Sequence, residues 1–202
     1  ELYNSDPISK DARLCGTTAS LCGLEKALYE QDEEEIRKAA GWVIMLHAYL
    51  LVQSGIPVLY CGDEIGQLND YSYHDDPMKR EDSRYLHRGK FQWDLQKKIC
   101  EEGTSQHQIF NALKELETFR AEHKVFEAQA DIEMLETYDN AILGIKRSRD
   151  EEKLIALFNF SQEEKTAWIQ EDGLYTDVMS GEQKEAKAVL VPAGSFCWLY
   201  QV

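Results

Sequence analysis

The chain has 202 residues, of which 43% are hydrophobic, and its formal net charge is −15 at pH 7. This length fits one or two domains, and the hydrophobic content argues against a disordered protein. The negative charge repels phosphate backbones and anionic lipid, which disfavours nucleic acid and membranes as partners, whereas a neutral sugar is compatible with it.

The cysteines indicate free thiols. They are odd in number, scattered, mostly in apolar neighbourhoods, and contain no CxxC pair, which argues against a disulfide framework and against zinc. Buried free thiols fit a reducing cytoplasm, so we expect a cytoplasmic protein. The five are Cys15, Cys22, Cys61, Cys100 and Cys197.

Two helical segments are expected before residue 54. The small, glycine-flanked run 16–24 (GTTASLCGL) predicts a tightly packed turn or short helix. Residues 32–53 predict a strong helix, because Asp32 can cap its N-terminus, three glutamates follow, and apolar residues recur at helical spacing. Its second half is apolar almost all round, so we expect it to be covered on more than one face, with His47 as a core histidine and not a ligand.

A buried strand and a long loop are expected next. Ser54 and Gly55 end the helix, and residues 56–61 form an apolar run without alternation, as in a parallel strand buried on both faces. Residues 62–103 contain no convincing regular element. A loop of that length with many aromatic residues is typically functional and not disordered.

The rest of the chain reads as one helix and then strands. Ser105 and Gln108 predict a capping box at the start of a second helix. After about residue 128 the pattern changes to short strands separated by turns, which predicts a small antiparallel β-sandwich. Residues 1–127 therefore look like the end of a larger α/β domain, and residues 128–202 like a separate β domain.

Three motifs carry a resemblance to a known family. GIPVLYCGDE (55–64) resembles the last-strand motif of the α-amylase superfamily of glycoside hydrolases, which are (β/α)8 barrels. NDYSYHDDPMKREDSRYLHRGKFQWD (69–94) is similar to the loop of amylosucrase and its close sucrose-hydrolysing relatives, and ARLCGTTASLCGL (12–24) resembles the segment before the seventh barrel helix. The resemblance implies the end of a (β/α)8 barrel over 1–127, followed by a C-terminal β-sandwich over 128–202.

The resemblance also implies a reaction. Such enzymes cleave sucrose with retention and pass the glucosyl unit to an α-glucan or to water, without a metal or organic cofactor. Their catalytic carboxylates lie on earlier strands, and the only His-Asp dipeptide here, His74-Asp75, follows the strand motif instead of preceding it. We therefore expect this chain alone to be inactive. Alternatives are a piece of a sucrose phosphorylase or trehalose synthase, or a non-catalytic glucan-binding module.

Five site residues follow from the resemblance. In such barrels the loop after a strand reaches the active-site mouth. Arg84 matches the family arginine that pairs with an early-barrel Asp at the floor of the glucose pocket, and Arg13 matches one near the fructose or acceptor side. The alternative for each is an exposed arginine. Asp63 and Glu64 are adjacent, so they cannot flank one glycosidic bond, and we interpret them, with Asp82, as architecture of the site.

Other clusters receive structural interpretations. The acidic residues of the long loop do not fit an EF-hand and are expected to be solvated, and Cys61, His74 and His87 follow no zinc template. Four aromatic residues of the β domain are expected in its core and not on a sugar-binding platform: Trp168, Tyr175, Trp198 and Tyr200. Because residues 32–61 are too apolar to be left bare, we expect an isolated fragment to self-associate.

Overall fold

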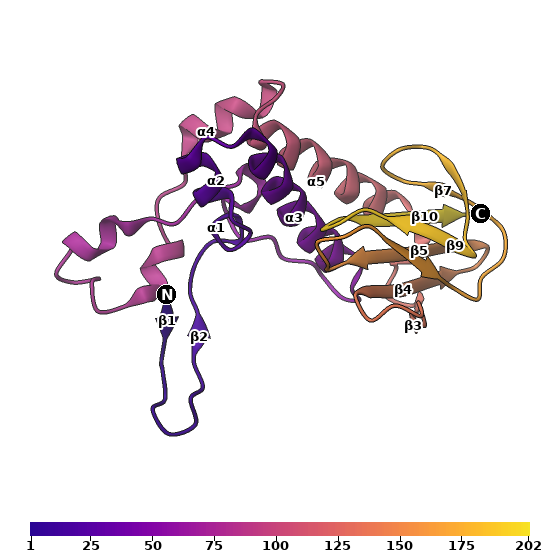
Figure 1. Ribbon diagram of the computed structural model, residues 1–202, viewed down its shortest axis with the longest axis horizontal. Coiled ribbons are helices and arrows are strands. Elements are labelled where there is room, and N and C mark those ends of the chain that lie inside the picture. The colour runs from indigo at the N-terminus through magenta and orange to yellow at the C-terminus, as the bar shows by residue number, and fades with distance from the viewer. The chain divides into compact units, whose positions relative to one another are not determined.

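The computed structural model describes all 202 residues (Figure 1). The chain divides into two compact units, one comprising residues 1–43 and 59–110 and the other residues 44–58 and 111–202. The helices are α1 (Thr18–Leu21), α2 (Leu24–Glu30), α3 (Glu33–Val52), α4 (Trp93–Lys97) and α5 (Ser105–Glu122). None of them combines the length and the apolar composition needed to cross a membrane.

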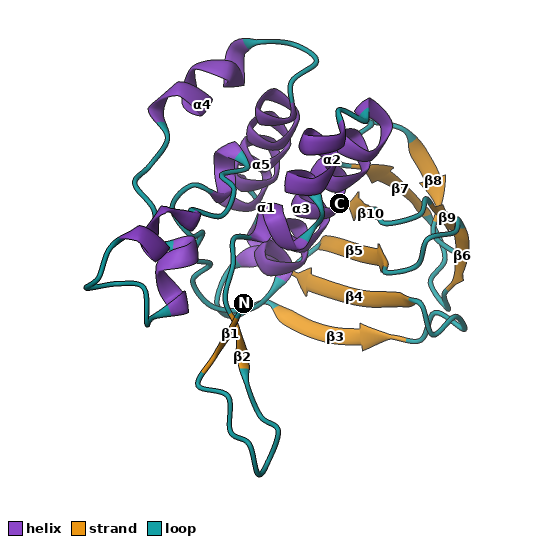
Figure 2. Ribbon diagram, turned by 60° about the vertical axis from the view of Figure 1, so that its left-hand side comes forward, coloured by secondary structure: helices purple, strands orange, loops and turns teal.

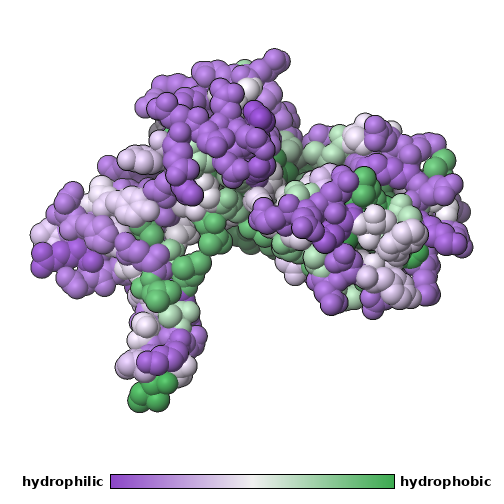
Figure 3. All heavy atoms as spheres, viewed as in Figure 1, coloured by the Kyte–Doolittle hydropathy of each residue, from purple (hydrophilic) through white to green (hydrophobic).

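The first unit is helical and is held together by a short hairpin and a long loop. Strands β1 (Leu2–Tyr3) and β2 (Arg13–Leu14) pair in an antiparallel hairpin. Figure 3 shows hydrophobic atoms at the tip of this hairpin, where Ile8 is 92% exposed. Helix α1 confirms the short helix expected over 16–24.

Helix α3 begins as its sequence predicts. The Oδ1 atom of Asp32 accepts the backbone N–H groups of Glu34 and Glu35 at 3.0 and 3.1 Å, which caps the helix. The consecutive residues Val43, Ile44 and Met45 are all buried, which confirms that the helix is covered on more than one face. His47 is also buried, as expected.

The predicted strand over 56–61 does not form. These residues belong to no strand, Cys61 already lies in a turn, and Ile56 and Val58 are 91% and 77% exposed. A parallel strand exists only as part of a ladder with neighbours, and the described chain supplies none. Cys61 is therefore exposed, as is Cys100, so the expectation of buried thiols holds only for Cys15, Cys197 and the half-buried Cys22.

The long loop contains more local structure than expected. Besides α4 it has four short 3₁₀ turns: η1 (Asp63–Ile65), η2 (Tyr71–Asp75), η3 (Ser83–His87) and η4 (Lys98–Cys100). The cap of α5 also differs from the prediction. Thr104 Oγ1 accepts the N–H of His107 at 3.1 Å, so Thr104 and not Ser105 caps the helix.

The second unit contains two antiparallel sheets. Six strands lie in the order β3-β4-β5-β10-β7-β8, and β6 pairs with β9 (Figure 2). The strands are β3 (Asp131–Leu135), β4 (Ile142–Arg149), β5 (Glu152–Asn159), β6 (Lys165–Trp168), β7 (Leu174–Asp177), β8 (Gln183–Glu185), β9 (Ala188–Val191) and β10 (Phe196–Gln201). One hydrophobic core takes residues from both sheets, including Leu157, Val189 and Leu199.

The aromatic residues of these sheets divide into core and surface. Tyr175 and Trp198 are 1% and 0% exposed, as expected for core residues. Trp168 is 56% exposed, so its predicted place in the core is wrong. It ends strand β6 in the small sheet, where the register sets it opposite Ala188 and no third strand covers it.

The buried Arg147 and the half-buried Arg120 cap the end of α3 within the second unit. Arg147, on β4, is 1% exposed and donates to the carbonyl oxygens of Val52 at 3.0 Å and Val125 at 2.6 Å. Arg120, on α5, donates to the carbonyl of Leu51 and, at 2.9 Å, to that of Gly55. The last carbonyls of a helix carry partial negative charge, so the two guanidinium groups satisfy them without a carboxylate.

Candidate functional site

The candidate site is the loop 62–103, and it opens with a turn that uses both adjacent carboxylates. The Oε2 atom of Glu64 accepts the N–H of Gly62 at 2.8 Å. The buried Asp63 accepts the hydroxyl of Thr18, on α1, at 3.2 Å. The two carboxylates thus engage different partners within the first unit, and they do not flank a common space as a glycosidase pair must.

Asn69 ties the loop to α1 and α2, a role that the sequence did not suggest. Its Oδ1 atom accepts the N–H of Thr17 at 2.8 Å, and its own N–H donates to Ser20 Oγ at 3.0 Å. Its Nδ2 atom donates to Glu25 Oε2 at 3.3 Å and to Tyr71 Oη at 3.2 Å. One amide side chain therefore fixes the position of the loop on both short helices. The only signal was its place in the Asn-Asp pair after the strand motif.

Arg84 is held by a two-pronged ion pair. Its Nε and Nη2 atoms donate to Oδ1 and Oδ2 of Asp82 at 2.8 and 2.7 Å, and its guanidinium lies 4.5 Å from the ring centre of Tyr3. Asp82 also accepts the backbone N–H of Arg84 at 3.0 Å, which caps η3. The side-chain bond from Arg84 is the main reason that the pKa of Asp82 falls to about 2. The structure thus orients Arg84 through a residue only two positions away.

This geometry predicts the titration of Asp82. Because its pKa is depressed in the folded chain, its contribution to stability is present above its usual value of 3.8 and is lost as the pH falls toward about 2. We expect a carboxyl ¹³C titration to give a pKa near 2, and the variant Arg84→Gln to return it toward 3.8. An unshifted Asp82 in the unmodified chain would contradict the ion pair.

Arg13 lies near Arg84 through the hairpin. The register pairs Arg13 with Tyr3, the residue whose ring contacts the Arg84 guanidinium. Arg13 is itself exposed. The structure therefore places both predicted substrate-binding arginines on one part of the first unit, but it records no contact between their side chains.

Two further acidic residues of the loop, Asp70 and Asp76, have contacts within it. Asp70 Oδ1 caps η2 by accepting the N–H of Ser72 at 3.0 Å, and Asp76 pairs with Lys79 at 2.9 Å. Tyr73 donates to the carboxylate of Glu1, which His74 also contacts at 3.1 Å. Nowhere in the chain do three or more His, Cys, Asp or Glu side chains come together in a group that could hold a metal ion.

Arg84 has hydrogen-bond donors left for a ligand, whereas three carboxylates of the site are used in structural contacts. The guanidinium of Arg84 has donors that Asp82 does not use, and these can bond a hydroxyl or a second carboxylate. A retaining glycosidase needs an acid and a nucleophile about 5 Å apart. In this loop Asp63, Glu64 and Asp82 are each committed to a bond that holds the backbone or a neighbouring side chain.

Comparison with known proteins gives a shared fold and sequence matches at low identity. No family model matches the chain. Glucosylglycerate phosphorylase from Escherichia coli strain K12 is 28% identical over 138 residues, which cover 67% of this chain and 24% of that protein. The chain thus spans about a quarter of the length of this relative.

Solved structures of α-amylase-family glycoside hydrolases share its fold. AmyP in complex with maltose has a TM-score of 0.62 over 80% of this chain and 35% of its own. The trehalulose synthase MutB from Pseudomonas mesoacidophila MX-45 has a TM-score of 0.59 over 80% of this chain and 38% of its own. The trehalose-6-phosphate hydrolase of Bacillus licheniformis has a TM-score of 0.57 over 79% of this chain and 38% of its own. All three are 16% identical to this chain, so they establish the fold alone.

Proposed function

We propose that this chain is the C-terminal part of a retaining enzyme that cleaves sucrose and transfers the glucosyl unit to an α-glucan or to water. The observation that carries the proposal is the Asp82–Arg84 ion pair, in the loop after GIPVLYCGDE, within a fold that α-amylase-family enzymes share. In this proposal residues 1–127 are the end of the catalytic barrel and residues 128–202 its C-terminal β domain. A cytoplasmic location belongs to the proposal and rests on five cysteines without a disulfide.

The proposed roles follow from the contacts. Arg84 closes the glucose pocket of the intact enzyme, because Asp82 orients its guanidinium and leaves donors free. Arg13 lies on the acceptor side. Asp63 and Glu64 hold the start of the loop. The acid and the nucleophile come from the part of the intact protein that precedes this chain, and the chemistry needs no cofactor.

Phosphorolysis is a second candidate, favoured by the match to a glucosylglycerate phosphorylase. The two candidates differ in the group that accepts the glucosyl unit. The test is to incubate the intact protein with sucrose, with and without inorganic phosphate, and to identify the products. Glucan or free glucose in both samples supports the proposal. Glucose 1-phosphate that forms only with phosphate replaces it with the second candidate, and no sucrose consumption refutes both.

A non-catalytic glucan-binding module has less support. Two neighbouring solved structures are complexes of AmyP, with maltose and with maltotriose, and for this chain α-glucan binding is a proposal. Of the four aromatic residues considered for a platform in the β domain, Tyr175 and Trp198 are buried and Tyr200 packs edge-on against Phe119 at 5.2 Å. Only Trp168 remains available to a sugar in solution.

We also predict that the isolated 202-residue chain self-associates. The segment 56–60 exposes apolar side chains and is paired with no strand of this chain, which invites pairing with another chain. Ile56→Lys with Val58→Lys is expected to give a monomer, because like charges oppose edge-to-edge pairing. Met78→Lys with Ile8→Lys, which adds the same charge at other exposed apolar positions, should leave the association unchanged. Light scattering that finds a monomer of the unmodified chain at micromolar concentration would contradict the prediction.

A further inference from the structure

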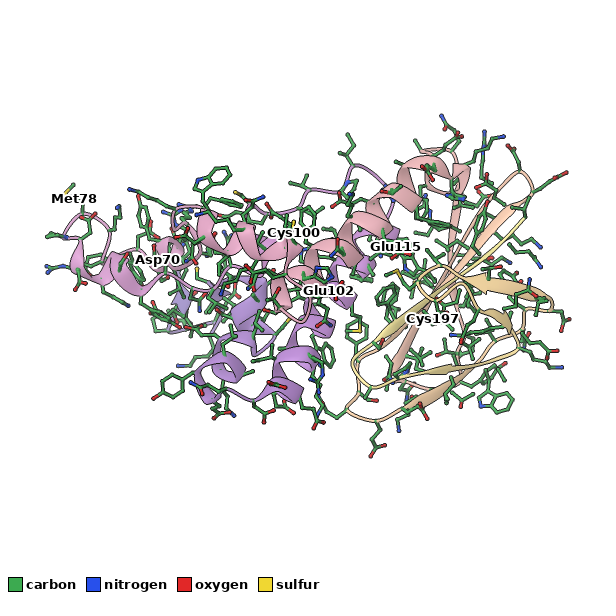
Figure 4. The ribbon with its side chains drawn as sticks, turned by 90° about the horizontal axis from the view of Figure 1, so that it is seen from above. Asp70, Met78, Cys100, Glu102, Glu115 and Cys197 are labelled. Carbon is green, nitrogen blue, oxygen red and sulfur yellow. The ribbon has the colours of Figure 1, made fainter.

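A pocket of about 600 Å³ lies within the loop 62–103, apart from Arg84. It is formed by the turns η2 and η3 and by the segment 88–92 that follows them. In Figure 4 Asp70, one of its lining residues, lies near the base of this loop and Met78 lies at its outer turn. The volume falls in the range of small-molecule binding sites, about 300–1,000 Å³.

The charges in the pocket are unusual for this chain. Three cationic side chains line it, Lys79, Arg88 and Lys90, against two carboxylates, Asp70 and Asp76. Lys79 is paired with Asp76 at 2.9 Å, whereas Arg88 and Lys90 are exposed and have no ion-pair partner. In a chain with 37 acidic and 22 basic residues, two unpaired cations at one cavity form a local site for an anion.

The rest of the lining suits the body of a sugar. The aromatic residues Tyr73, Tyr85 and Phe91 contribute to the walls, and Ser72 and Gln92 add neutral polar groups. Pockets for small polar ligands typically combine aromatic walls with a few well-placed polar groups. The lining therefore offers apolar faces and hydrogen-bonding groups next to the two cations.

The walls of the pocket are fixed before any ligand binds. The N–H of Asp70 donates to the carbonyl of Leu86 at 2.8 Å, which joins the two turns. Gly89 packs on Asp70 so closely that a Cβ atom there would lie 2.7 Å from the carboxylate. Gln67 donates to the carbonyl of Lys90 at 3.2 Å and accepts the N–H of Gln92 at 3.1 Å, which holds the cationic segment in place. Such preorganisation lowers the entropic cost of binding.

We infer that this pocket binds a sugar that carries an anionic group, a phosphate or a carboxylate. Arg88 and Lys90 hold the anion, and the aromatic walls contact the sugar. This inference does not rest on the proposed function, because sucrose is neutral and binding can be measured on the 202-residue chain without catalysis.

The test is calorimetric titration of the chain with four probes: glucose 6-phosphate, glucuronate, glucose and inorganic phosphate. We expect glucose 6-phosphate or glucuronate, or both, to bind, and the better of the two shows whether the natural anion is a phosphate or a carboxylate. The preferred probe should bind at least tenfold more tightly than glucose and inorganic phosphate, and more weakly as salt is raised. The inference would be overturned if neither anionic sugar binds. It would also be overturned if inorganic phosphate binds as tightly as the preferred anionic sugar.

Matched variants locate the binding. Arg88→Gln and Lys90→Gln each remove one charge, and each should weaken binding about tenfold or more, since a hydrogen bond to a charged group is lost. Lys98→Gln removes the same charge at an exposed position outside the pocket and should have no effect. Circular dichroism confirms folding of each variant. Equal weakening by all three, or by none, would refute the site.

Discussion

Replacing Arg147 with alanine is expected to destabilise the second unit by about 3 kcal/mol or more, because two buried carbonyl groups lose their hydrogen-bond donor. Arg147 is the donor to Val52 and Val125, and its guanidinium lies 5.5 Å from the ring centre of Phe126. Each buried polar group left without a partner costs about 1–3 kcal/mol, and the lost packing adds to this. The loss is measured as the change in the free energy of unfolding in urea.

Arg149 provides the control on the same strand. It lies two residues further along β4, its side chain is 37% exposed, and it contacts Glu127 at 3.6 Å and, in an exposed hydrogen bond, the carbonyl of Gln129 at 3.4 Å. Arg149→Ala should cost less than about 1 kcal/mol, as for other surface ion pairs. Arg147→Lys keeps the charge but cannot reproduce the several hydrogen bonds of the planar guanidinium. Its loss of stability should therefore lie between those of Arg147→Ala and Arg149→Ala. Equal stability of Arg147→Ala and the unmodified chain would contradict the capping role of this arginine.

The elements that local signals specify were predictable from the sequence. The start of α3 depends on one cap residue, Asp32, and on helical periodicity, and both act within a few residues. The change from helical to strand periodicity after residue 128 is also a local signal, and the antiparallel strands are present. Even there, Thr104 and not Ser105 caps α5, because a helix start is uncertain by a residue when two hydroxyl residues are adjacent.

The features that the sequence analysis predicted wrongly or missed depend on residues distant in the sequence. The segment 56–61 has the composition of a buried strand, but a parallel strand needs neighbours that no local pattern supplies. The capping of α3 by Arg120 and Arg147 joins residues 65 to 95 positions apart, so neither arginine could be assigned to it.

The candidate site also contains contacts that the sequence indicated and contacts that it did not. Asp63 and Glu64 were expected to face apart as neighbours at a strand end, but they lie in the turn η1, where Glu64 bonds the N–H of Gly62 and Asp63 bonds Thr18 on α1. The partner of Arg84 in this chain, Asp82, was named as part of the site, but the bond between them was not predicted. Asn69 holds the loop through residues 44 to 52 positions away, and its place in the Asn-Asp pair does not identify those partners.

Under the proposed function, Arg84→Ala in the intact protein is expected to lower kcat/KM for sucrose about a hundredfold or more. If Arg84 reaches a buried carboxylate of the barrel, its removal leaves that charge unpaired, which typically costs roughly 3–5 kcal/mol. The Nε and Nη2 atoms already bond Asp82, so the guanidinium is held in one orientation and Nη1 is left to bond the second carboxylate. Arg84→Lys should recover little activity, because an ammonium group cannot bond two carboxylates in this planar geometry.

Arg80 is the matched control in the same loop. Its side chain is 58% exposed and forms an ion pair with the neighbouring Glu81, so Arg80→Ala should change kcat/KM less than about twofold. Circular dichroism separates loss of activity from loss of folding. A folded Arg84→Ala enzyme with near-normal kcat/KM would remove Arg84 from the site.

The most direct test is the turnover of sucrose by three proteins. These are the intact protein, this 202-residue chain alone, and a truncated form of the intact protein from which the 202-residue chain has been removed. We expect turnover only by the intact protein, because the proposed function assigns the acid and the nucleophile to a part of the protein outside this chain, and Arg84 with its loop to this chain. Removing the acid and nucleophile forfeits most of a rate enhancement on the order of 10⁶ or more. Sucrose cleavage by the 202-residue chain alone, or full activity of the truncated protein without it, would contradict this division of the active site.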